Sequence, residues 1–295
     1  ESEKVKEGLM QLNIVLNGGA GGHSGMDIHK GIANVNKMMN RLLLECLGEA
    51  DFRLVSLRGG GLRNAIPRES EAVIVLDPQD ETAFKQSLVS SFQQIQAEYK
   101  TTDPGLQVAC TSQPNTASVC MPEDDQLAIL MGIQTCPVGI HRMSPDIPNL
   151  VQTSNNLARV ELEDGEVTIQ CLCRSSVNSE KDDHANSIAC AFALAGLETD
   201  FSGVYPGWTP NPSSEIVSIV KDIYEDKFKE SPRVLACHAG LECGILGTNY
   251  PEMDMVSFGP NIRGAHSPDE CVQISSVQKF WGFFLDVLGQ IPEKK

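Results

Sequence analysis

Basic residues are scarce in this sequence, which argues against negatively charged partners. The chain has 23 lysines and arginines against 39 aspartates and glutamates, which gives a formal net charge of -16 at pH 7. Phosphate backbones and anionic membranes attract proteins through clustered Lys and Arg side chains. We therefore expect no nucleic acid and no membrane as a partner.

Long apolar runs and paired cysteine motifs are missing as well. No stretch approaches the roughly 20 apolar residues of a membrane helix, and the N-terminus lacks the charged-then-apolar pattern of a signal peptide. The ten cysteines include no Cys-x-x-Cys pair. Free thiols in a reducing compartment are the simpler interpretation, and they predict a soluble, cytoplasmic protein.

The length of 295 residues favours two domains, since single cores stop growing at about 250–300 residues. Apolar spacings of three or four predict helices in the first part of the chain, at residues 28–46, 84–99 and 179–197. Strands are predicted at residues 12–16, 52–57, 71–76, 106–110, 157–162 and 167–173. Asp164-Gly165 is a hairpin signal between the last two strands. The pattern predicts an α+β domain over residues 1–204, an open β-sheet with helices on one face.

The composition changes at residues 205–212, where three prolines, a glycine and Trp208 interrupt any regular pattern. Beyond this boundary we predict a helix that starts at Asn211 and Pro212 and runs through Phe228. Short buried strands are predicted at residues 233–237 and 253–258, and a capping box of Ser275 and Gln278 is predicted to start the last helix. The predicted buried stripe of that helix consists of Val277, Phe280, Trp281, Phe284 and Leu288. Residues 205–295 should therefore form a second, α/β domain.

Glycines surround His23. Residues 18–25 contain neither Gly-x-x-x-x-Gly-Lys nor a complete Gly-x-Gly-x-x-Gly, and Met26 stands where a serine-hydrolase elbow needs a glycine. The small neighbours should leave the imidazole of His23 accessible, so that it could donate a hydrogen bond to a developing oxyanion. The alternative is a loop histidine that caps the helix predicted from Ile28.

Asn64 and Arg174 are candidate substrate-binding residues. Asn64 lies between a glycine-rich turn and Pro67, where its amide could hold a substrate carbonyl or bond to its own backbone. Arg174 ends an apolar strand, where its guanidinium could bind a carboxylate through two hydrogen bonds or form a surface ion pair. Position in the sequence does not decide between these alternatives.

Two histidine clusters follow the predicted domain boundary. His266 comes just after a predicted strand, where a neutral imidazole would be a good zinc ligand, although a lone histidine is usually structural. His238 and Glu242 form the other cluster together with Gly240 and Gly244, and Glu242 could support a metal ligand or begin a helix.

Four short segments, taken in order, resemble the aminoacyl-histidine dipeptidase family of the di-zinc clan that also holds aminoacylases and glutamate carboxypeptidases. They are Gly-Gly-His-Ser-Gly (21–25), Asn-Ala-Ile-Pro-Arg (64–68), His-Ala-Gly-Leu-Glu-Cys-Gly (238–244) and Gly-Ala-His-Ser-Pro-Asp-Glu (264–270). The resemblance covers essentially the whole chain. It implies that residues 1–204 are a lid domain inserted into a zinc-binding α/β catalytic domain, and that residues 205–295 are the C-terminal half of that catalytic domain.

The resemblance also implies roles for single residues. His266 matches the last zinc ligand, and His23 matches the lid histidine that polarises the scissile carbonyl, in this clan often across a dimer. Asn64 and Arg174 match lid residues that grip the substrate, with Arg174 at its C-terminal carboxylate, and Gly240 matches a backbone position that lines the pocket. The implied activity is hydrolysis of Xaa-His dipeptides by two zinc ions per active site, in a homodimer formed through the lid.

Most of the family's zinc-binding residues are nevertheless missing. None of the six histidines is followed two residues later by an acidic residue, and no Glu-Glu pair occurs. One histidine cannot hold two metal ions and also supply a base. We therefore expect a truncated part of such a metallopeptidase that is inactive by itself. The alternatives are a non-catalytic dimerisation or peptide-binding module, and another amidohydrolase or peptidase of the same clan.

Overall fold

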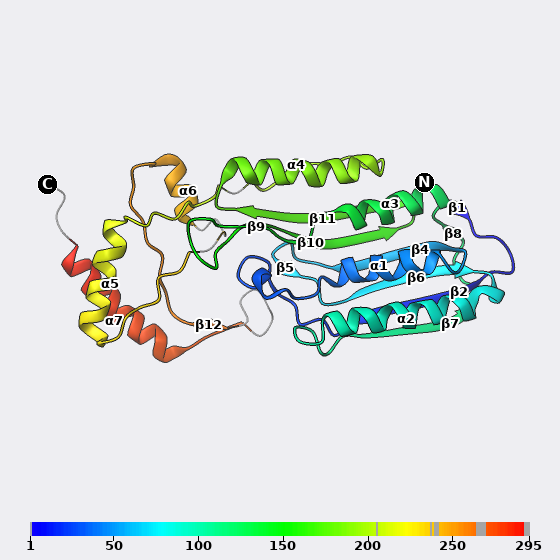
Figure 1. Ribbon diagram of the computed structural model, residues 1–295, viewed down its shortest axis with the longest axis horizontal. Coiled ribbons are helices and arrows are strands. Elements are labelled where there is room, and N and C mark those ends of the chain that lie inside the picture. The colour runs from blue at the N-terminus through cyan, green and yellow to red at the C-terminus, as the bar shows by residue number, and fades with distance from the viewer. Residues whose placement is uncertain (1, 205, 237, 239–241, 264–269, 292–295) are drawn as a thin grey trace.

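The computed structural model describes residues 2–204, 206–236, 238, 242–263 and 270–291. Its largest element is an antiparallel sheet of seven strands, elongated in Figure 1. The strands follow the order β11-β10-β4-β6-β2-β7, and β9 pairs with β10. Their bounds are β2 Met10–Asn17, β4 Phe52–Gly60, β6 Ser70–Leu76, β7 Gln107–Pro114, β9 Gly139–Met143, β10 Val151–Glu163 and β11 Glu166–Ser175.

Helices α1 to α4 form a single layer along this sheet (Figure 1). They are α1 Val35–Leu47, α2 Glu81–Glu98, α3 Glu123–Thr135 and α4 Asn178–Leu194. Within the layer α1 contacts both α2 and α3, and α3 contacts α4. The predicted class, an open sheet with helices on one face, is confirmed.

The main core lies between the sheet and the helix layer. Leu12, Ile14 and Leu16 alternate along β2 and have no exposed surface, because side chains two positions apart share one face of a strand. The stripe of α2 that begins at Phe84 and Leu88 meets them in the same core, as its spacing predicted. The alternating side chains of β2 and the stripe of α2 are therefore buried in the same core.

The β10–β11 hairpin is confirmed, and its turn explains why Asp164-Gly165 signalled it. The strands pair as far as Glu163 opposite Glu166, so the loop has two residues. Asp164 and Gly165 have φ angles of 52° and 81°. Asp and Gly tolerate these left-handed conformations, which match the twist of the flanking strands.

The structure corrects the first predicted helix and adds one that was not predicted. Residues 28–46 are divided into the 3-10 helix η1 Ile28–Lys30 and α1, because Gly31 takes a φ of 66° and ends the first turn. A new helix starts after Asn34, whose side chain accepts the N–H of Lys37. The sequence reading missed α3, although its first turn is acidic.

The C-terminal region contains α5 Glu215–Phe228, α6 Glu242–Asn249, α7 Ile274–Gln290 and a short pairing of β12 Ile262–Arg263 with β13 Cys271–Val272. Side chains of α5 and α7 form a second hydrophobic cluster, separate from the main core: Val220, Ile223, Phe283 and Val287. The domain boundary at residues 204 and 205 stays a prediction. No helix among the described residues has the length and apolar character needed to cross a membrane.

The predicted strands, helix starts and buried stripe of this region are wrong. The described parts of residues 233–237 and 253–258 are not strands, and Leu235 is 78% exposed, since no neighbouring strand among the described residues receives their backbone hydrogen bonds. The helix predicted from Asn211 begins later, because Ser214 is the N-cap of α5.

The last helix, α7, also differs from its prediction. Its N-cap is Gln273, which makes no side-chain capping bond, in place of Ser275. Phe283 and Val287 are its buried residues, whereas Trp281 of the predicted stripe is exposed. Packing on α5 decided which face of the helix is covered.

Candidate functional site

The candidate site is built around the loop that carries His23. His23 belongs to the two-residue strand β3 Gly22–His23 and lies opposite Ala65 of β5 Ala65–Ile66. Its backbone N–H donates to Oδ2 of Asp27 at 2.8 Å, and Oδ1 of Asp27 pairs with Nζ of Lys30 at 2.6 Å. Burial raises the pKa of Asp27, but the hydrogen bonds from Lys30 and His23 outweigh it and lower that pKa overall. A charged Asp27 therefore fixes the turn.

The imidazole of His23 is oriented by its own loop. Its Nδ1 accepts the backbone N–H of Gly25 at 3.1 Å and that of Met26 at 3.0 Å. A ring nitrogen that accepts carries no proton, so a neutral His23 holds its proton on Nε2. This tautomer makes Nε2 a hydrogen-bond donor. The ring does not cap η1, whose N-cap is Asp27. The role of His23 as an oxyanion donor stays a prediction.

Ser24 joins His23, Asn64 and Arg174 into one group. The buried Ser24 donates its backbone N–H to the carbonyl oxygen of Asn64 at 2.7 Å. Its hydroxyl accepts from Nε of Arg174 at 3.3 Å. Gly25 keeps the space beside them open, because a Cβ atom there would lie 3.1 Å from the His23 ring and 3.5 Å from the Arg174 guanidinium. Three candidates far apart in sequence thus meet within a few ångströms of Ser24.

The loop that carries Asn64 is held by buried amides. Asn156 of β10 donates through Nδ2 to the carbonyl oxygens of Arg63 at 3.2 Å and Ala65 at 2.7 Å. Asn34, the N-cap of α1, donates in turn to Oδ1 of Asn156 at 3.1 Å. Buried polar groups with partners on both sides rigidify the backbone they contact. Asn64 is therefore positioned from the sheet and not only by its own turn.

His238 is a neighbour of this group that sequence reasoning noted without giving it a role. It is 3% exposed, and its Nε2 lies 2.7 Å from Oγ of Ser154. Burial, together with the charges of Arg174, His23 and His29, lowers the pKa of His238 from 6.5 to about 4. His238 is therefore a neutral imidazole at pH 7. Its position after an apolar run and between small residues is the same signal that singled out His23.

The low pKa of His238 makes the stability of the protein depend on pH. The pKa of His238 is lower in the folded protein than in the unfolded chain, so protonation favours the unfolded chain. The free energy of unfolding should therefore be highest above pH 6.5 and should decrease as the pH falls toward 4. The difference between the folded and unfolded pKa values of His238 corresponds to about 3 kcal/mol of the free energy of unfolding. Urea denaturation at pH 7 and pH 4 is expected to show this loss in the protein and not in a His238→Asn variant. Equal losses in both would contradict the assignment.

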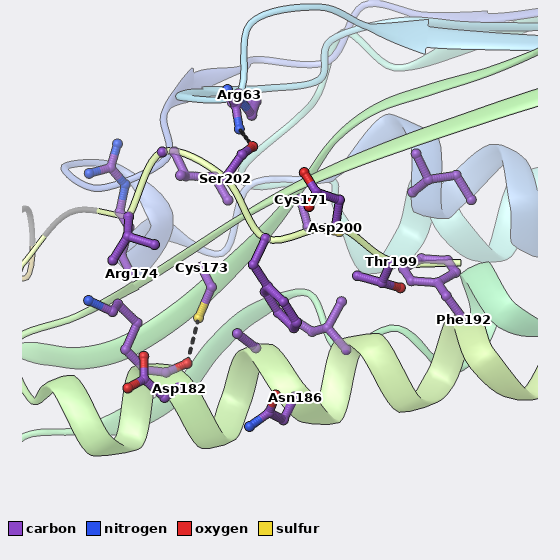
Figure 2. Close-up of a pocket in the computed structure, with 18 of the residues that line it drawn as sticks. Arg63, Cys171, Cys173, Arg174, Asp182, Asn186, Phe192, Thr199, Asp200 and Ser202 are labelled. Carbon is purple, nitrogen blue, oxygen red and sulfur yellow. Dashed lines mark hydrogen bonds between the residues drawn. The ribbon is translucent and has the colours of Figure 1, made fainter. Parts of the chain in front are cut away.

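A pocket of about 660 Å³ adjoins Arg174 and His238. It lies between β11, α4 and the segment 198–204, as Figure 2 shows, and Arg63 reaches Ser202 across its rim at 3.3 Å. Its lining combines apolar side chains with charged groups of both signs, the cationic Arg63, Arg174 and Lys181 and the acidic Asp182, Glu198 and Asp200. The volume is in the usual range for small ligands. Neither His23 nor Asn64 lines this pocket. The pocket could therefore hold a small ligand that carries both charged and apolar groups.

The remaining predicted site residues cannot be placed. Gly240 and His266 lie outside the described residues. Among the residues that the structure does describe, no group of three or more His, Cys, Asp or Glu side chains could hold a metal ion. The described part of the chain therefore does not fit a zinc site by itself.

Two known proteins match the chain over its whole length. It is 38% identical over 295 residues to the cytosol non-specific dipeptidase of Escherichia coli (strain K12). It superposes on the crystal structure of aminoacylhistidine dipeptidase from Vibrio alginolyticus with a TM-score of 0.87 and 37% identity, covering 100% of this chain. Over its whole length the chain resembles the aminoacyl-histidine dipeptidase family. It spans 60% of the length of each of these two relatives. No family model matches it.

The similarity to dipeptidases gives a context for the group around Ser24. The family resemblance first pointed to His23, Asn64 and Arg174 separately, and the structure brings all three together. The dipeptidase family name does not itself assign roles to them.

Proposed function

We propose that the intact protein is a zinc-dependent cytoplasmic dipeptidase that cleaves Xaa-His dipeptides, and that this chain supplies its substrate-binding groups. The 38% identity to a dipeptidase across the whole chain carries the proposal. The grouping of His23 and Arg174 around Ser24 supports it, because a dipeptide presents a scissile carbonyl and a carboxylate a short distance apart.

Each of the two side chains has a task that its chemistry permits. Nε2 of His23 donates a hydrogen bond to the carbonyl oxygen as negative charge develops on it. The guanidinium of Arg174 binds the C-terminal carboxylate and fixes the dipeptide. Asn64, on the loop held by Asn156, contacts the substrate beside them.

We propose that this chain alone is inactive and that two zinc ions bind only in a longer polypeptide. The absence of a metal-binding group among the described residues supports this, as do exposed apolar side chains of the C-terminal region such as Leu235 and Trp281. Unpartnered apolar surface of this kind is typical of a covered interface.

Assays of the chain and of the longer polypeptide on a histidine-containing dipeptide test both parts of the proposal. Only the longer polypeptide is expected to bind zinc tightly and to release histidine. Activity and tight zinc binding in the chain alone would contradict the missing-ligand argument. A longer polypeptide that prefers tripeptides or acylated amino acids would make it another peptidase or amidohydrolase of the clan, and inactivity of both would favour a binding module.

Arg174→Ala in the longer polypeptide is expected to lower kcat/KM for a dipeptide about 10- to 100-fold, mainly through KM, because a hydrogen bond to a charged group contributes about 1.5–3 kcal/mol. A dipeptide amide lacks the carboxylate, so the variant and the unaltered protein should cleave it at similar rates. Arg159→Ala, which removes a partly exposed arginine paired with Glu161, is the matched control. A loss on the amide equal to that on the free dipeptide would contradict the carboxylate role.

We also propose that the protein is a homodimer that pairs through the region of the large sheet. β7 and β11 lie at the two ends of the strand order of that sheet, and edge strands present unpaired backbone groups. Light scattering at several concentrations is expected to give twice the monomer mass. A monomer at all concentrations would remove this part of the proposal.

A further inference from the structure

Cys136 and Cys171 lie in direct contact, although 35 residues separate them in the sequence. Cys136 follows the last turn of α3, and Cys171 lies on β11, with the two Sγ atoms 3.9 Å apart. A disulfide bond is about 2 Å long. The two sulfurs would therefore need to approach by about 2 Å, a movement within reach of side-chain rotation.

The surroundings of Cys136 favour its thiolate. Nζ of Lys37 binds the carbonyl oxygens at the end of α3, including that of Cys136 at 2.9 Å. Nδ2 of Asn155 lies 3.7 Å from Sγ of Cys136. The hydrogen bond from Cys171 and the charge of Lys37 lower the pKa of Cys136 in spite of its burial, whereas the same contact and burial raise the pKa of Cys171. One thiol is thus prepared as nucleophile and the other as proton donor.

Two other thiols, Cys46 and Cys173, differ from the pair in their pKa. Burial raises the pKa of Cys46 and of Cys173 to about 12 in each case, so both stay protonated. Cys171 and Cys173 line the 660 Å³ pocket, and Figure 2 labels both on β11. A small molecule in the pocket therefore reaches the pair at Cys171, with Sγ of Cys136 3.9 Å from Sγ of Cys171.

We propose that Cys136 and Cys171 are a redox modification site that closes to a disulfide bond on reaction with hydrogen peroxide. The Cys136 thiolate attacks one peroxide oxygen, the O–O bond breaks, and a sulfenic acid forms. The hydroxide that leaves takes the proton of Cys171. The Cys171 thiolate then attacks the sulfenic sulfur and displaces a second hydroxide, which is protonated by solvent. Two thiols and one peroxide give one disulfide and two waters.

The bond would join the end of α3 to the strand that carries Arg174. Arg174 lies three residues after Cys171 on β11. The cross-link would thereby couple the oxidation state to the wall of the pocket. Transient disulfides of this kind are the form found in reducing compartments. The inference does not depend on the proposed dipeptidase activity.

Peptide mapping of the unaltered protein tests the proposal and requires no variant to fold. After peroxide treatment, alkylation and non-reducing proteolysis, one cross-linked peptide is expected to contain Cys136 and Cys171, and dithiothreitol should remove it. The free thiols counted in denaturant should fall from ten per chain to eight. Oxidation confined to exposed thiols such as Cys190, with no such cross-link, would overturn the proposal.

Variants separate the two steps. Cys171→Ser is expected to stop at a sulfenic acid on Cys136 that dimedone labels, whereas Cys136→Ser should abolish both labelling and cross-link. Cys173→Ser, on the same strand and in the same pocket, should leave the cross-link intact. Dimedone labelling of Cys171 in the Cys136→Ser variant would show that the assigned nucleophile is wrong.

Discussion

Replacing His23 with alanine in the longer polypeptide is expected to lower kcat for a dipeptide by about 10²- to 10³-fold, because removal of one preorganised donor to an oxyanion has this effect. Nδ1 of His23 already accepts two backbone N–H groups, so the lost donor is Nε2. KM should change little, since the hydrogen bond strengthens only as charge develops in the transition state. Steady-state kinetics measure both constants.

Two further variants separate the donor from the loop contacts. His23→Asn places an oxygen where Nδ1 accepts the N–H groups of Gly25 and Met26, and it should be as inactive as the alanine variant. His23→Gln can place an amide N–H near the position of Nε2 and should recover part of the rate. The exposed His29 lies six residues away, and His29→Ala should leave kcat unchanged. Full activity of His23→Asn would show that the ring only shapes the loop.

Phe84→Ala is expected to lower the free energy of unfolding of the large sheet and its helices by about 3–5 kcal/mol. Phe84 has no exposed surface, and its ring meets Phe52 edge-to-face with centroids 5.3 Å apart. The variant loses the buried area and also leaves a cavity between α2 and β4. Such aromatic pairs contribute about 0.5–1.5 kcal/mol beyond their area.

Urea denaturation followed by far-UV circular dichroism measures this loss. Both tryptophans, Trp208 and Trp281, lie outside the large sheet and its helices, so their fluorescence would not report on this core. Val89 is half-exposed on the same helix, and Val89→Ala is the matched control with an expected change below about 0.5 kcal/mol. A similar midpoint for Phe84→Ala and Val89→Ala would contradict the placement of Phe84 in the core.

The elements predicted best are those whose signal lies within one segment. The strand alternation of β2, the stripe of α2 and the Asp164-Gly165 turn each depend on local geometry, and all three are confirmed. Predictions failed where a distant partner decides the outcome. The buried face of α7, for example, depends on α5. The end of η1 is a local feature that was also missed, because it depends on the left-handed conformation that Gly31 adopts.

The candidate site divides in the same way. Its residue types and the family could be predicted from the sequence, because four short motifs carry the resemblance. The part played by Ser24, the neutral state of His238 and the contact of Cys136 with Cys171 could not. The sequence by itself determined which side chains are available and the local periodicity that forms the sheet and helices. Only the tertiary structure decided which of these side chains are in contact and which of them are protonated, because contacts and pKa values depend on groups that are far apart along the chain.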